Sequence, residues 1–129
     1  VVADFVCGLH AESFKFSGDV GNPVVAATLM MPFMGRLLQS KFEDYVLSAL
    51  RTTSAVANEV APILRSPDCW KSDLASAGRR AECEACFQEL VKLKLLVTEL
   101  TGHSPPVGPR AMRLQAKMDE LVLAVQQAR

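Results

Sequence analysis

Apolar residues between Arg79 and Leu100 recur at steps of three and four, which is the period of one face of an α-helix. Gly102 follows this stretch, where a glycine in the left-handed conformation commonly ends a helix, and Pro105 and Pro106 oppose any continuation. The pattern predicts a helix over residues 79–100 whose inner face consists of Cys83, Cys86, Phe87, Leu90, Leu93, Val97 and Leu100.

The same period predicts a short helix within residues 1–14 and long helices over residues 23–39, about 40–61 and 110–128. The last of these turns inward Ala111, Leu114, Met118, Leu121, Val122 and Val125. No strand pattern competes, and the connectors are short. The sequence therefore predicts an all-α fold, an up-and-down four-helix bundle with an extra short N-terminal helix, as a single domain over residues 1–129.

Local signals refine these helix boundaries. Pro32 is expected to kink the helix that contains it, because proline removes one ladder hydrogen bond. Ser40 and Glu43 have the spacing of a capping box, so either a new helix begins there or the preceding helix continues, and Pro62 is expected to end the helix that follows. Trp70, the only tryptophan, is expected to plug one end of the core.

The charge balance limits the kind of partner. Fourteen basic and fourteen acidic residues cancel, so the chain lacks the electrostatic footprint of a nucleic-acid binder. The longest uncharged run, Val20–Gly35, is shorter than the roughly 20 apolar residues of a membrane-spanning helix, and a buried helix is expected there. Because the chain begins at Val1, we expect a processed form or a fragment, and composition leaves the compartment unknown.

Catalytic motifs are absent from the sequence. It has two histidines, His10 and His103, no Glu-x-x-His pair, no glycine-rich phosphate loop and no nucleophile motif. We therefore expect a protein that is not an enzyme and that binds no cofactor.

The four cysteines are too few and too unevenly spaced to indicate a disulfide framework. Cys83 and Cys86 lie about a turn inside the predicted helix, where they are expected to behave as small apolar residues rather than as a redox pair. A zinc site made of Cys69, this pair and His103 is disfavoured by the long first spacing, and no metal is expected. Whether the two helical cysteines are free stays open.

Some apolar residues are not needed by the bundle. Met112, Ala116 and Leu123 fall on a line away from the inner face of the last helix, and Leu95 falls among polar residues on its neighbour. Scattered surface apolar residues are common, but a line of them is typical of a surface that binds a partner. We interpret Leu95, Met112 and Leu123 as partner-binding residues.

Arg110, Arg113 and Lys117 form a basic flank at the start of the last helix. Positive charge at a helix N-terminus opposes the helix dipole and costs about 0.3–1 kcal/mol where it is exposed. This flank is either a solvated face or a docking site for an acidic protein surface or anionic lipid headgroups. We include its three residues among the partner-binding candidates.

The leading hypothesis is thus a non-catalytic subunit or adaptor that docks onto a larger protein assembly. One alternative is a carrier of a small apolar ligand, with Met30, Met31, Phe33 and Met34 lining a pliable pocket. A second alternative is a secreted effector or signalling bundle.

Residues 60–74, VAPILRSPDCWKSDL, combine a helix end with prolines, a short polar turn, Trp70 and the start of another helix. From about residue 60 to the end, this layout resembles the PsbQ-type extrinsic proteins of photosystem II. The resemblance implies a four-helix bundle in the thylakoid lumen that shields a membrane complex by peripheral contact, without chemistry or a transmembrane segment of its own. It carries over two residues, Trp70 and Leu74, as packing positions.

Overall fold

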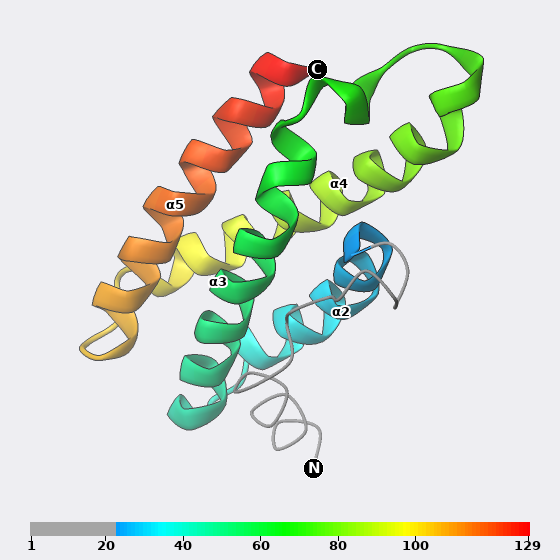
Figure 1. Cartoon of the computed structure of the whole chain (residues 1–129). Helices are drawn as coiled ribbons and strands as arrows, with labels where there is room; N and C mark the ends of the chain where they lie inside the picture. The colour runs from blue at the N-terminus through cyan, green and yellow to red at the C-terminus, as the bar shows by residue number, and fades with distance from the viewer. Residues whose placement is uncertain (1–22) are drawn as a thin grey trace.

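The computed structural model describes residues 23–129, and these fold into four α-helices (Figure 1). The helices are α2 (Pro23–Leu38), α3 (Glu43–Arg65), α4 (Ala77–Leu100) and α5 (Val107–Ala128), with two 3₁₀ turns, η2 (Pro67–Trp70) and η3 (Leu74–Ser76), between α3 and α4. No strand occurs in this part of the chain, and the predicted all-α bundle is confirmed. The short helix predicted within residues 1–14 lies outside the described residues.

The bundle consists of two helical hairpins, α2–α3 and α4–α5. Helix α2 packs against α3 and α4, and α5 packs against the same two helices. Figure 1 shows α3 and α5 running in one direction and α2 and α4 in the other, so the direction alternates along the chain. The connector between the hairpins, residues 66–76, joins α3 to α4, which make few contacts with each other. Because α5 packs against α3, these two helices lie side by side although they belong to different hairpins.

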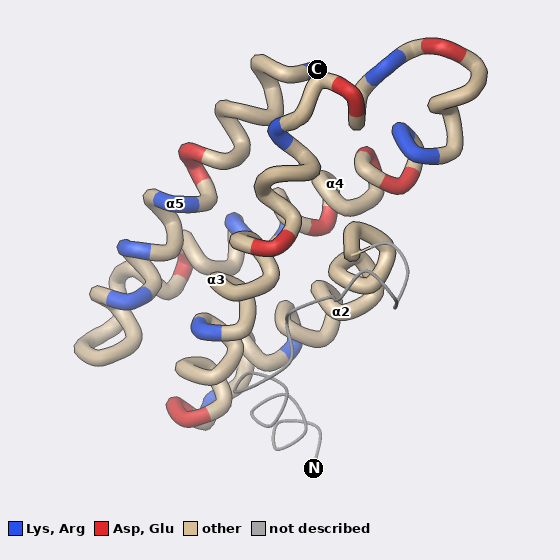
Figure 2. The backbone as a smooth tube through the Cα atoms, in the orientation of Figure 1, with Lys and Arg blue, Asp and Glu red and all other residues tan. Residues whose placement is uncertain are grey.

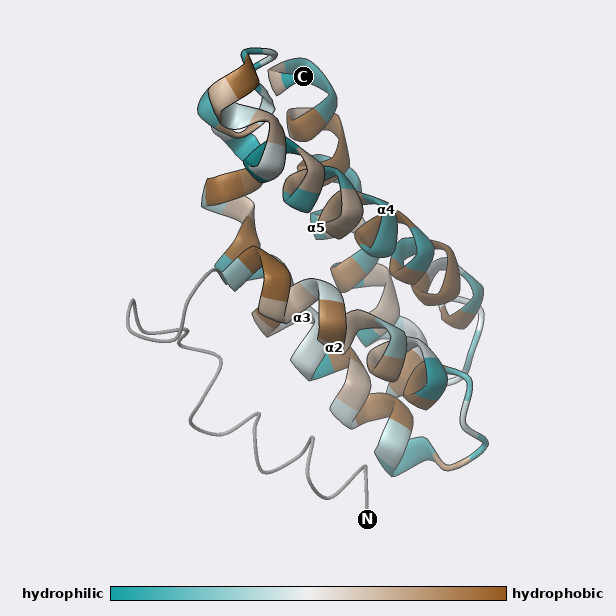
Figure 3. Ribbon diagram, turned by 90° about the vertical axis from the view of Figure 1, so that its right-hand side faces the viewer, coloured by the Kyte–Doolittle hydropathy of each residue, from teal (hydrophilic) through white to brown (hydrophobic). Residues whose placement is uncertain are grey.

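All four helices contribute to one hydrophobic core. The seven residues predicted for the inner face of α4 are its buried residues, and Figure 3 shows the alternation of hydrophobic and hydrophilic positions along this helix. On α5 the predicted inner face is buried except for Val122, which is half-buried, and Val107 and Gly108 are buried in addition. The helical period thus located most of the core on these two helices.

Helix α3 differs from its predicted boundaries at both ends. The expected capping box does not form, because the Ser40 hydroxyl accepts from the Phe42 N–H (3.1 Å) and the helix begins only at Glu43. At the other end the helix continues through Pro62 to Arg65. The last turn is held by packing, since Leu64 is fully buried.

Helix α5 begins at Val107, three residues before the predicted start. Pro109 is therefore inside the first turn, where its missing N–H has no helical partner to lose. Gly108 packs against the preceding loop, and its N–H donates to the Ser104 carbonyl (3.3 Å). Gly102 does not adopt the left-handed conformation expected after α4, and the helix C-cap Thr101 instead donates its N–H to Thr98 in a tight turn.

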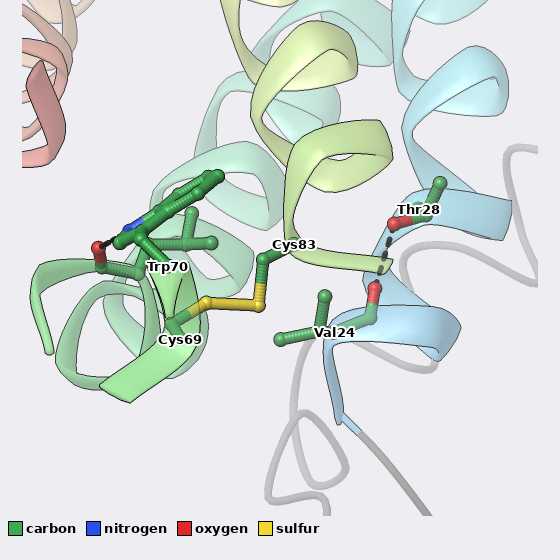
Figure 4. The surroundings of a disulfide bond; sticks show 6 residues. Val24, Thr28, Cys69, Trp70 and Cys83 are labelled. Carbon is green, nitrogen blue, oxygen red and sulfur yellow. Dashed lines mark hydrogen bonds between the residues drawn. A yellow bond between two sulfur atoms is a disulfide. The ribbon is translucent and has the colours of Figure 1, made fainter. Parts of the chain in front are cut away.

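The connector between α3 and α4 is fixed by an aromatic plug and a disulfide bond (Figure 4). Trp70 is buried, as predicted, and its Nε1 donates to the Leu64 carbonyl (2.8 Å). Cys69 of η2 forms a disulfide with Cys83 of α4, so the expectation that Cys83 is simply a small apolar residue is wrong. The helical period revealed the burial of Cys83 but not its partner, which is 14 residues away in an irregular turn. Cys86 remains a buried thiol.

Within the described part of the chain, no helix has the length and apolar content needed to cross a membrane.

Candidate functional site

A groove runs between α3 and α5 on the outside of the bundle. Its volume is about 460 Å³. Leu50 and Leu114 are nearly buried and give it an apolar base. The complete lining is Leu50, Arg51, Ser54, Arg110, Arg113, Leu114 and Lys117. The structure thus brings the three predicted basic residues of α5 into one groove and adds Arg51 from α3, which the sequence analysis missed.

The groove is strongly positive because its lining contains four cations and no carboxylate. Lys117 Nζ donates to the Ser54 hydroxyl (3.1 Å) and ties the two walls together. The other three cations are exposed, and they make no side-chain ion pair or hydrogen bond with the described residues. Figure 2 shows this basic part of α5 beside α3, with acidic segments farther along both helices.

The nearest turn of α5 does not neutralise the groove. Asp119 follows Lys117 closely in sequence, but its carboxylate pairs with Lys94 of α4 at 2.7 Å. That ion pair lies at the contact between α4 and α5, on the other side of the helix from α3. The positive charge of the groove is therefore left available to an anionic ligand.

The predicted apolar residues Leu95, Met112 and Leu123 are all exposed, with 62%, 57% and 56% of their surface accessible. Met112 and Leu123 share the outer side of α5, whereas Leu95 is on α4. Gln115 Nε2 donates to the Thr98 hydroxyl (3.0 Å) where these two helices meet. The three side chains are thus accessible from solvent, and their binding role stays a prediction.

A second exposed apolar surface lies on α2 and was missed by the sequence analysis. Val25, Leu29 and Phe33, spaced four residues apart, are exposed, and the Arg36 guanidinium lies 5.9 Å from the Phe33 ring centroid. The signal was present in the sequence, because a helix without charges over its first 13 residues is apolar on every side. The expectation of a buried helix over this run holds for one face of α2 only, because the opposite face is exposed to solvent.

The methionine cluster proposed for a ligand carrier does not face one pocket. Met31 and Met34 are buried in the core, Met30 is half-buried, and Phe33 points to the surface. These four side chains therefore diverge around α2, which is incompatible with a shared lining. The carrier interpretation gains no support from them.

Within the described residues, neither a candidate metal cluster nor a reactive cysteine is found. Residues 23–129 contain no group of three side chains that could hold a metal ion, and the disulfide uses two cysteines of the disfavoured zinc set. Burial raises the pKa of the Cys86 thiol to about 11, so this cysteine is a neutral thiol at physiological pH and a weak nucleophile.

Comparison with known proteins places this bundle in a family. The family model for the con80 domain of katanin matches residues 24–118, which span α2 to the middle of α5. The chain is also similar to the katanin p80 WD40 repeat-containing subunit B1 of Gallus gallus, with 26% identity over 95 residues. That alignment covers 70% of this chain but only 14% of the chicken protein. No solved structure matches the chain.

These findings overturn the resemblance to PsbQ-type proteins, and with it the assignment to photosystem II and the thylakoid lumen. Of the two packing positions inferred from that resemblance, Trp70 is buried, but Leu74 of η3 is 93% exposed and is therefore not a core position. A tryptophan that closes a helix–turn–helix junction is a solution open to unrelated bundles. The matched residues run through all four helices described above, and the chain belongs to the family of katanin con80 domains.

Proposed function

We propose that this chain is a non-catalytic docking domain through which a katanin-type subunit binds another protein of its complex. The family match and the subunit named among its relatives support this proposal. The chain spans about a seventh of that relative's length, so it corresponds to one domain of a larger subunit.

The observation that carries the proposal is the exposure of large apolar side chains on the outer side of α5. Met112 and Leu123 each leave more than half of their surface in water. Ala116 lies between them along the helix and is also exposed. Burying one such Met or Leu side chain in an interface contributes about 1.5–3 kcal/mol, which is tenfold or more in affinity. Contacts of this kind are typical of the centre of a protein–protein interface.

The test is co-purification of the full protein with the other subunits of the katanin-type complex from its own cells. We expect Met112→Glu and Leu123→Glu to weaken recovery of those subunits at least tenfold, because each variant places a charge in the proposed interface. Leu74→Glu is the matched control, since Leu74 is even more exposed but lies in the connector between α3 and α4. Equal recovery with all three variants would refute docking through this side of α5.

A further inference from the structure

We propose that the basic groove between α3 and α5 binds a short acidic peptide segment that carries an apolar anchor residue. This inference builds on the proposed docking function and names the chemistry of one ligand. It rests on the combination of cations on both walls with an apolar base formed by Leu50 and Leu114. Neither feature alone would select such a ligand.

The cations have a spacing that matches a peptide. Arg110, Arg113 and Lys117 are separated by three and four residues, so they follow one side of α5 over roughly 10 Å. Arg51 faces them from α3 across the groove. Carboxylates two residues apart on an extended chain, or three to four apart on a helix, have a similar spacing of about 5–7 Å and point to the same side. Arginine is suited to this role because its guanidinium binds a carboxylate through two hydrogen bonds.

The apolar base of the groove provides the binding site for the anchor side chain of the peptide. Leu50 and Leu114 keep only 3% and 5% of their surface exposed, at the bottom of an open volume of about 460 Å³. This volume is large enough for a Leu, Met or Phe side chain with part of its backbone. Anchoring such a side chain displaces water from the cations, which strengthens their attraction to carboxylates. A simple anion would gain only the charge interaction.

The extent of the positive surface favours a short peptide over a membrane or a nucleic acid. Glu120 lies on the next turn of α5, three residues after Lys117, while Asp44 and Glu59 lie before and after the basic position on α3 (Figure 2). A flat anionic bilayer or a long polyanion would meet these carboxylates as well as the groove. A segment of a few residues can avoid them. The zero net charge of the chain also provides no long-range attraction for a polyanion.

The position of the arginines supports a ligand rather than a role in stability. Arg110 and Arg113 lie in the first two turns of α5, whose N-terminus has a partial positive charge. Neither arginine is paired within the described residues. Neutral or acidic residues at these positions would therefore make helix α5 more stable. A bound carboxylate would form ion pairs with the arginines and would interact favourably with the partial positive charge at the helix N-terminus.

The experiment measures binding of fluorescent synthetic peptides to the full protein by anisotropy. The probe is a ten-residue peptide with four Glu residues and one central Leu. Its two comparison peptides replace all Glu by Gln, or the Leu by Ser. We expect each replacement to weaken binding about tenfold or more, and the affinity for the acidic peptide to fall steeply as salt is added.

Charge reversal in the groove is the decisive change. Arg113→Glu and Arg51→Glu should each weaken binding of the acidic peptide at least tenfold. Arg79→Glu is the matched control, because Arg79 is an exposed arginine in the first turn of another helix, α4, and is not part of the groove. Thermal unfolding of every variant verifies that the fold is retained. Equal weakening by the control, or no weakening by the groove variants, would overturn the proposal.

Two further probes separate the alternative ligands. Phosphatidylserine vesicles or a 12-nucleotide single-stranded DNA that bind more tightly than the peptide, and lose this binding with Arg113→Glu, would show that the groove binds lipid or nucleic acid instead. Failure of the groove inference is distinguishable from failure of the docking function. If only the groove inference fails, Arg113→Glu leaves peptide binding unchanged while Met112→Glu still reduces recovery of the complex subunits. If only the docking function fails, Arg113→Glu weakens peptide binding while Met112→Glu leaves recovery of the subunits unchanged.

Discussion

Gly108 is the position where adding a single methyl group should be most disruptive. A Cβ atom at this glycine would lie 1.9 Å from the carbonyl oxygen of His103 and 3.2 Å from that of Thr101. Real Cβ atoms essentially never come within 3.0 Å of a heavy atom outside their own residue and its chain neighbours, and both obstacles here are backbone atoms. The loop between α4 and α5 would have to move, together with the hydrogen bond from the Gly108 N–H to Ser104.

The size of the effect follows from two opposing contributions. Overpacking of this kind costs about 1–3 kcal/mol, and a backbone obstacle places it at the upper end. Alanine has a higher helix propensity than glycine, which offsets up to about 1 kcal/mol. We therefore expect Gly108→Ala to lower the free energy of unfolding by about 2 kcal/mol. The corresponding fall in Tm is about 6–10 °C for a chain of this length.

Urea unfolding followed by circular dichroism measures this difference, and a glycine elsewhere supplies the control. Gly78 is in the first turn of α4, and a Cβ there would meet nothing within 4 Å. Gly78→Ala should therefore leave the free energy of unfolding unchanged or raise it by up to about 1 kcal/mol. If Gly108→Ala were as stable as the Gly78→Ala variant, the close approach between the loop and α5 would be wrong.

Two further predictions concern the cysteines. The Cys69–Cys83 disulfide closes a loop over a sequence separation of 14. Replacing both cysteines by serine should lower the free energy of unfolding by about 3 kcal/mol, because the unfolded chain gains conformational entropy. An unfolding midpoint that a thiol reductant leaves unchanged would contradict the crosslink. Burial raises the pKa of Cys86 from 9.0 to about 11, so the folded state retains a proton that the unfolded state releases between these values. Stability should thus be full below pH 9 and fall toward pH 11 relative to a Cys86→Ala variant, and a constant difference between the two proteins would refute the shift.

The fold was predictable where the signal was local. The inner face of α4 followed from the helical period, since each buried residue is one turn from the next. Boundaries were less certain, because tertiary contacts decide them. Pro62 is accommodated within α3, where the next turn is held by the burial of Leu64 and the hydrogen bond from Trp70. Such contacts with the connector are not encoded in the helical period.

The basic groove was only half predictable. Arg110, Arg113 and Lys117 share one side of a helix, so the sequence shows them as a flank. Arg51 is distant in sequence and belongs to the other hairpin. A single sequence indicates which residues share a helix face but not which helices are neighbours. The pairing of α3 with α5, and hence the second wall of the groove, required the structure.

The arrangement of the two hairpins couples ligand binding in the groove to the orientation of one hairpin relative to the other. One wall of the groove belongs to α2–α3 and the other to α4–α5, and only the connector of residues 66–76 joins these halves along the chain. A ligand that grips Arg51 and Arg113 together would act as a clamp across the halves. Conversely, any partner that tilts one half against the other would change the distance between these arginines and hence the affinity of the groove for its ligand.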